Sequence, residues 1–287
     1  MKVVVKDINK IQPSQLYLCE EKLVEAEVYI ESVSFDKVEP LPVKTIGKHT
    51  FFTDGHTRAY ALYKKGIEKI KVYEDKDALN WLEYLICLEW CKAEGILQIA
   101  DLREKIIPER DYQKYWLNRC RNMQQKVEAN PDDFIEIKPL TNCTSKSEIT
   151  DVILRRLPEW FGIEEAIQEY VEGVKKTTFL TAKIKSTEIG FISLKEHNNY
   201  TGEIYVMGIL KEFHRRGIGK KLTDYAAMIL KNENKKFMTV KTLSSSHPDK
   251  NYQKTRKFYR AMGFFPLEEF KELWGEESPC LFMVKKL

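Results

Sequence analysis

The sequence predicts a mixed α/β protein of the α+β kind, built from two parts. Three observations predict this class. Residues 203–210 form an apolar run typical of a strand buried on both faces, and apolar residues then recur at helical spacing over 218–229. Apolar residues also recur at helical spacing over 79–90, in a separate segment. Residues 128–133 are polar and include Pro131, which predicts the boundary between the two parts.

The first part, residues 1–76, has the elements of a small α+β domain. In chain order we expect strands at 3–5 and 28–30, a strand ending at Thr53, a tight turn at Asp54 and Gly55, a helix over 57–65 that Gly66 ends, and a closing strand to Tyr73.

Residues 77–128 are expected to form a helical extension of this domain, and residues 129–134 a linker. Cys87 and Cys91 are four apart and share one helix face. No histidine lies near them in sequence, so buried thiols are expected rather than a metal site. The extension also carries basic residues interleaved with aromatic ones, which fits either a solvated helix face or contacts to nucleic acid: Arg103, Arg110, Arg119 and Arg121.

The second part, residues 135–287, alternates strands and helices. In chain order we expect a helical segment at 157–162 and a helix over 163–174, strands at 177–182 and 188–194 joined by a turn at 185–187, the strand at 203–210, a helix from 218, and a helix ended by Gly263 before an extended segment.

A glycine-containing turn, residues 215–220, separates the strand at 203–210 from the next helix. The first N–H groups of a helix have no intrahelical partner, and the helix dipole adds partial positive charge there. Such a turn can bind the phosphates of a cofactor, and Gly217 and Gly219 let the backbone approach them closely. The spacing excludes a Walker loop, which needs Ser or Thr after Gly-Lys, and a dinucleotide fingerprint, because Leu222 stands at its third glycine.

The turn Arg215-Arg216-Gly217-Ile218-Gly219 resembles the coenzyme A loop of GNAT-family N-acetyltransferases, whose pattern is Gln/Arg-x-x-Gly-x-Gly/Ala. The first pattern position here is His214, a departure of small weight because the loop acts through backbone N–H groups. Residues 251–266, which contain Phe258-Tyr259 and Gly263-Phe264, resemble the second signature of the family. The resemblance covers 135–287 and implies a mostly antiparallel mixed sheet flanked by helices, with acetyl-CoA as acyl donor.

The resemblance also implies roles for individual residues. Tyr259 stands where the general acid of the family usually lies, although a core aromatic is the alternative. Glu203 is the best candidate for the general base, although a carboxylate at a strand start is often simply solvated. The expected cofactor-binding residues, in the strand edge, the turn and the second signature, are Met207, Gly208, Ile209, Arg215, Arg216, Gly217, Ile218, Gly219, Lys220 and Asn251.

In the first part, Asp54-Gly55-His56-Thr57-Arg58 resembles the Gly-x-x-Arg box of the ParB/sulfiredoxin-like fold. That box lies at a helix N-terminus, and the resemblance implies a nucleotide phosphate held by these residues. His56 stands where the reactive cysteine of sulfiredoxin would be, so sulfiredoxin chemistry is not expected. The alternative is that His56 and Arg58 tie the turn to neighbouring residues.

Together these observations predict an acetyl-CoA-dependent N-acetyltransferase that acts on an amine acceptor by direct transfer, with an N-terminal accessory domain. The alternative is a non-catalytic regulator that senses coenzyme A and binds a nucleotide or nucleic acid; a different acyl donor also stays open. The net charge of +4 does not require a polyanionic partner. The six cysteines lack a disulfide spacing, and no signal peptide or long apolar span is evident, so a cytoplasmic protein without a membrane span is expected.

Overall fold

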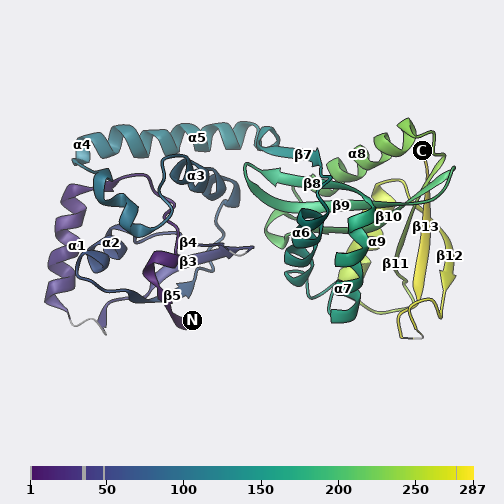
Figure 1. The fold of residues 1–287 in the computed structure, drawn as a ribbon, viewed down its shortest axis with the longest axis horizontal. Coiled ribbons are helices and arrows are strands. Elements are labelled where there is room, and N and C mark those ends of the chain that lie inside the picture. Colours follow the sequence, from purple (N-terminus) through teal and green to yellow (C-terminus); the bar gives the residue numbers. More distant parts are fainter. Residues whose placement is uncertain (1, 34–36, 48, 276) are drawn as a thin grey trace. The chain divides into compact units, whose positions relative to one another are not determined.

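The computed structural model describes residues 2–33, 37–47, 49–275 and 277–287 (Figure 1). The chain divides into two compact units, Met1–Phe134 with Ile184–Ser186, and Ile135–Lys183 with Thr187–Leu287. In the described ranges, every helix is too short or too polar to cross a membrane. The class predicted from sequence, a mixed α/β protein, is confirmed.

The first unit contains a four-stranded sheet in the order β1-β5-β3-β4. Strand β5 pairs antiparallel with β1 and parallel with β3, which in turn pairs antiparallel with β4. Helix α2 connects β4 to β5, as the sequence predicts. The bounds are β1 (Val3–Asp7), β3 (Leu41–Ile46), β4 (His49–Phe52), α2 (His56–Lys64) and β5 (Lys69–Glu74).

The strand expected at 28–30 is wrong, because this segment belongs to helix α1 (Glu20–Ser32). The β-branched run there resembles a strand, but the apolar spacing over the longer window is helical: Leu23, Ala26 and Ile30 are buried. Val28 is 61% exposed on the other side of the helix. Local composition was therefore outweighed by the burial pattern of the whole helix.

The rest of the first unit is mostly helical, as predicted for 77–128. A short parallel pair joins β2 to β6. Cys87 and Cys91 are buried on α3, which confirms the expected buried thiols. The bounds are β2 (Leu18–Cys19), α3 (Trp81–Ala93), a 3-10 segment (Ile99–Lys105), β6 (Ile106–Ile107), α4 (Glu109–Tyr112), a π-helical turn (Gln113–Leu117) and α5 (Asn118–Ala129).

The second unit is built on a seven-stranded sheet in the order β12-β13-β11-β10-β9-β8-β7. The pairs β10–β9, β11–β13 and β12–β13 are antiparallel, and β10–β11 is parallel. The sheet is therefore mixed and mostly antiparallel over these pairs, as expected. The strands are β7 (Ile135–Pro139), β8 (Thr178–Ile184), β9 (Thr187–Asn198), β10 (Thr201–Ile209), β11 (Phe237–Leu243), β12 (Phe265–Phe270) and β13 (Cys280–Lys286).

Four helices accompany this sheet: α6 (Cys143–Arg155), α7 (Glu164–Gly173), α8 (Ile218–Asn232) and α9 (Lys250–Ala261). The expected helices at 163–174 and from 218 are confirmed. The helical segment expected at 157–162 is wrong: these residues form the turn between α6 and α7, where Trp160 N and Phe161 N both bond to Leu157 O. The sequence analysis did not anticipate α6, whose N-cap is the side chain of Asn142.

Candidate active site

Strands β10 and β11 lie side by side at one end and separate at the other. Their parallel pairing runs from Thr201↔Phe237 to Ile204↔Val240, and among the described residues it extends no further. Both strands continue, to Ile209 and to Leu243. The separated ends therefore leave an opening in the middle of the sheet.

A cavity of about 860 Å³ occupies this opening. It is lined by the separated parts of β10 and β11, the start of α8, one side of α9 and the turn between α6 and α7. Of the cofactor-binding residues expected from sequence, eight line it: Met207, Gly208, Ile209, Arg215, Gly217, Ile218, Gly219 and Lys220. Arg216 and Asn251 are not among the lining residues.

The N-terminus of α8 opens into this cavity without a side-chain cap. Gly217 is the N-cap residue and has a φ of 74°, a left-handed conformation that favours glycine. Gly219 lies so close to Phe258 that an added Cβ would be 3.0 Å from its ring. The first-turn N–H groups are thus available to an anion, and the two glycines are needed for different reasons, conformation and close packing.

A β-bulge at Tyr205 changes which face of the sheet each residue of β10 occupies. Ile204 pairs with Leu194 and Val206 with Ser193, so Tyr205 is the extra residue. Before the bulge, Gly202 faces Leu230 of α8; after it, Gly208 faces Ile153 of α6. The two faces of the strand therefore do not alternate regularly over 203–210. Because of the bulge, Ile209 lies on the side of α8, where it approaches Gly219.

Glu203, the expected general base, is buried and held by two basic side chains. Lys241 donates to its Oε1 at 2.7 Å, and His197 Nε2 forms a short contact with its Oε2. Lys241 lines the cavity, whereas Glu203 does not. The side chain of Lys241 therefore lies between the Glu203 carboxylate and the cavity, and the carboxylate is already bonded to Lys241 and His197.

Tyr259, the expected general acid, lies in the cavity wall and is also part of the core. Its ring centroid is 5.3 Å from that of Phe258 and 5.5 Å from that of Phe264. Burial raises the pKa of Tyr259 well above its ordinary value, with smaller contributions from Tyr252 and Tyr170. In the part of the chain that the structure describes, no hydrogen bond engages its hydroxyl. Tyr259 is therefore a core aromatic that also lines the cavity, and its role as general acid stays a prediction.

Several aromatic residues of the cavity wall were missed from sequence. Tyr170 of α7 contacts Tyr205 edge to face at 5.3 Å and Phe161 at 6.0 Å. Tyr252 donates its hydroxyl to Trp160 O at 2.7 Å, and burial raises the pKa of this hydroxyl to about 12. These rings come from separate segments of the chain, so their spacing in the sequence does not predict that they cluster in the fold.

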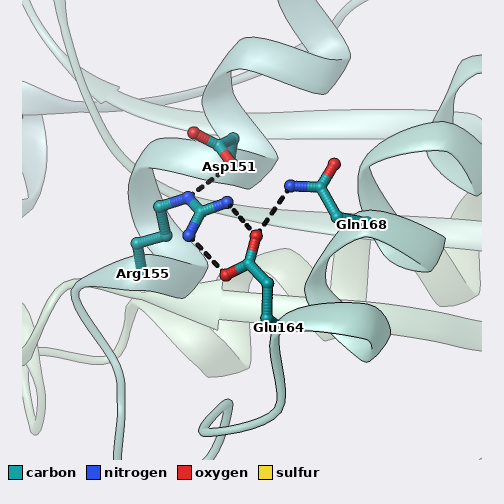
Figure 2. Close-up of polar contacts among 4 residues, drawn as sticks. All are labelled: Asp151, Arg155, Glu164 and Gln168. Carbon is teal, nitrogen blue, oxygen red and sulfur yellow. Dashed lines mark hydrogen bonds and ion pairs between the residues drawn. The ribbon is translucent and has the colours of Figure 1, made fainter.

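Helix α7, which carries Tyr170 of this wall, is joined to α6 by a polar cluster. Figure 2 shows Arg155 of α6 between Asp151 and Glu164, with Gln168 also bonded to Glu164. Arg155 donates to both oxygens of Glu164 at 2.7 Å, a bidentate pair. These bonds, followed by that from Gln168, lower the pKa of Glu164 to about 2. The cluster fixes the start of α7 against α6, which positions Tyr170 two turns later.

In the first unit, the box at 54–58 is at the start of α2, and Gly55 is its N-cap with a φ of 75°. His56 is buried, and its Nε2 accepts a hydrogen bond from the backbone N–H of Ser14 at 3.0 Å. Arg58 forms an ion pair with Glu39 at 3.3 Å. Both side chains therefore bind neighbouring residues, as in the alternative given from sequence. Nucleotide binding by Asp54, Thr57 and their neighbours, and the ParB/sulfiredoxin-like resemblance, stay predictions.

Several of the solved structures to which the chain is similar are described as acetyltransferases. A GNAT-family acetyltransferase from Desulfovibrio desulfuricans is 13% identical, with 53% of this chain and 98% of that chain covered and a TM-score of 0.47. One from Elizabethkingia anophelis with acetyl-CoA bound is 21% identical (54% and 100% covered, TM-score 0.41). The aminoglycoside 6'-N-acetyltransferase from Enterococcus faecium is 17% identical (53% and 96% covered, TM-score 0.42).

Sequence comparison matches one segment of the chain to a known domain family. An uncharacterized N-acetyltransferase of Chlorobaculum tepidum is 22% identical over 147 residues, which cover 48% of this chain and 86% of that protein. Residues 175–266 match the sequence model of the acetyltransferase (GNAT) domain, and they include β10, the turn before α8, and Tyr259. The second unit of this chain therefore carries a GNAT acetyltransferase domain.

Proposed function

We propose that this protein is an N-acetyltransferase that moves the acetyl group of acetyl-CoA directly to an amine. The observation that carries the proposal is a single cavity that joins the uncapped N-terminus of α8, the separated edges of β10 and β11, and the hydroxyl-bearing ring of Tyr259. A phosphate site, an extended channel and a proton donor are the parts that a thioester donor and its leaving thiolate require.

The residues at the α8 end suit the pyrophosphate of coenzyme A. The backbone N–H groups from Gly217 to Lys220 are the anion site, and the glycine at 219 keeps Phe258 against the turn. Arg215 and Lys220 line the cavity there and add positive charge. When bound, acetyl-CoA supplies the acetyl group on a thioester, and the free edge of β10 at Met207–Ile209 is positioned to pair with the amides of its pantetheine arm.

The proton required by the leaving thiolate would come from Tyr259. Because burial raises its pKa, the phenol is fully protonated at neutral pH, so it is available as a donor. Glu203 would act as a base only through Lys241 or through water, because its carboxylate is held behind Lys241. The role of the first unit, in substrate binding or regulation, stays a prediction.

Calorimetric titration of acetyl-CoA into the full-length protein tests the proposal, with Gly217→Glu as the test variant and Gly66→Glu as its control. Both glycines have nearly the same positive φ, 74° and 75°, and open space around them, so both variants carry the same backbone strain. We expect binding to the wild type and to Gly66→Glu, and none to Gly217→Glu, where a carboxylate meets the phosphates. Absence of binding to the wild type would overturn the proposal.

Binding of acetyl-CoA without transfer of its acetyl group would instead indicate a regulator. A regulator that only senses coenzyme A would bind it through the same turn and would release no coenzyme A in the presence of any amine. Release of coenzyme A that depends on an added amine separates the enzyme from that regulator.

A further inference from the structure

The wall of the cavity on the side of α7 and the bulge is built from aromatic rings. Six contribute, from the turn before α7, α7 itself, β10, α9 and the segment after β12: Trp160, Phe161, Tyr170, Tyr205, Tyr252 and Trp274. Phe161, Tyr170 and Tyr205 form a continuous edge-to-face series. We call these six residues the aromatic wall.

The polar atoms of this wall are largely bonded within the protein. Trp160 Nε1 donates to Thr255 Oγ1 at 3.1 Å, and Tyr252 donates its hydroxyl to Trp160 O. The Tyr205 hydroxyl donates to Glu169 O at 3.4 Å. Three of the five side-chain polar atoms of the wall are thus bonded within the protein, so a bound molecule meets mostly ring faces and edges, and such a surface favours an apolar or aromatic body.

The charges around the wall do not favour a polycation. The buried carboxylate of Glu203 is already bonded to Lys241 and His197. Over the described ranges, the side chains that line the cavity include no Asp or Glu, whereas they include five basic ones: Arg215, Lys220, Lys241, Lys254 and Lys257. Four of these lie on the α8 turn or on α9, and Lys241 on β11 adds a fifth positive charge. Arg215 and Lys220 belong to the proposed anion site, so a polycation is disfavoured because an acceptor with several ammonium groups would meet no unpaired carboxylate among the described lining residues.

We propose that the acceptor is a monoamine with an aromatic body, which the aromatic wall binds with its amine directed toward Tyr259. This assignment rests on the proposed function. Three observations support the assignment. Aromatic rings form the wall, most of their polar atoms are bonded within the protein, and the Glu203 carboxylate is already bonded to Lys241 and His197.

The test uses the full-length protein with saturating acetyl-CoA and measures coenzyme A release with a thiol reagent. The acceptors are 2-phenylethylamine, n-butylamine as an aliphatic monoamine, and spermidine and kanamycin as polycations. We expect kcat/KM to be highest for 2-phenylethylamine, by about 10-fold over the polycations, as expected for ring contacts that the others cannot make.

The variant Tyr170→Leu probes the wall itself, with Tyr63→Leu as its control. Tyr63 packs against Tyr60 at 6.0 Å in the first unit, so it loses a comparable ring contact that is not part of the cavity. We expect Tyr170→Leu to lower kcat/KM for 2-phenylethylamine about 3- to 10-fold with little effect on n-butylamine. The Tyr63→Leu variant should leave both values unchanged.

The outcomes separate the two proposals. If acetyl-CoA binds but spermidine or kanamycin is preferred, or if 2-phenylethylamine neither reacts nor binds to the loaded protein by calorimetry, the inference about the acceptor is overturned while the donor assignment stands. If acetyl-CoA itself does not bind, the proposed function is overturned, and the acceptor assignment with it.

Discussion

The buried histidine at the start of α2 should make the first unit less stable in mild acid. Burial lowers the pKa of His56 to about 4, with only a smaller opposing contribution from Asp54. In the unfolded chain its pKa would be about 6.5, so below this pH the unfolded state binds a proton that the folded state excludes. The stability contributed by the neutral imidazole is therefore complete above pH 6.5 and is lost as the pH falls toward 4.

The size of this loss follows from the same values. Because one pKa unit corresponds to about 1.36 kcal/mol, the full loss is about 3 kcal/mol, and about 2 kcal/mol of it has occurred at pH 5. The variant His56→Gln keeps an oxygen that can accept from the Ser14 N–H but does not titrate. Its stability should change less between pH 8 and pH 5 than that of the wild type, by about 2 kcal/mol.

Hydrogen exchange of the amides in β3, β4 and β5 measures this difference within the first unit. Comparing wild type and variant at each pH cancels the intrinsic exchange rates. Ser14→Ala is the control: it keeps the N–H that bonds to His56, so the loss in acid should persist. Equal losses in wild type and His56→Gln would refute the argument. A gain in acid would reverse its sign, as expected if an anion at residues 54–58 held the imidazole protonated.

The remaining predictions concern the second unit. In Gly173→Ala the new Cβ would lie 2.2 Å from the Tyr205 hydroxyl, so the Tyr205 ring must move. The KM for the acceptor should therefore rise about 3- to 10-fold, while the Kd of acetyl-CoA should be unchanged. Parallel changes in KM and Kd would contradict this prediction. Tyr259→Phe should lower kcat at least about 100-fold and leave acetyl-CoA binding unchanged. Because burial raises the pKa of the Tyr259 hydroxyl, deprotonation of this hydroxyl should not lower the kcat of the wild type up to pH 10. An undiminished kcat in the variant would exclude Tyr259 as the proton donor. Arg155→Ala should raise the pKa of Glu164 from about 2 toward the ordinary value of about 4.3 without reaching it, because the bond from Gln168 remains; NMR titration measures this. The variant should lose most of a stabilisation that is present above pH 4.5 and is lost as the pH falls toward 2; a pKa that stays near 2 would show that another group lowers it.

Much of the fold was predictable where local chemistry and periodicity agree. The helix α8 was anticipated because a glycine turn, apolar residues at helical spacing and a preceding strand occur in succession. The helix α1 was not, although its buried positions have helical spacing, because the run Val28-Tyr29-Ile30 is also typical of a strand. Short apolar runs do not distinguish the two structures without the longer window.

The glycine turn before α8 was predictable because all its parts are adjacent in the chain, but the other side of the cavity was not. The partners of Glu203 come from β9 and β11, so its compensation depends on strand pairing. The aromatic wall depends on the contact between Tyr170 of α7 and the bulge residue Tyr205 of β10. Such contacts join segments that are far apart in the sequence and form only in the folded protein, so they could not be predicted from the residues of any one segment.

The bulge at Tyr205 has a consequence for how this strand can change during evolution or by design. Since one extra residue exchanges the two faces, residues 203 and 205 lie toward α7 while Ile209 lies toward α8. Under the proposed function, a substitution of Tyr205 would change the acceptor side of the cavity, and one of Ile209 would change the side next to the α8 turn. Deletion of Tyr205 itself would leave Val206 opposite Ser193 and Gly208 opposite Phe191, so it would remove the bulge and one ring of the aromatic wall while Gly208 still faced α6.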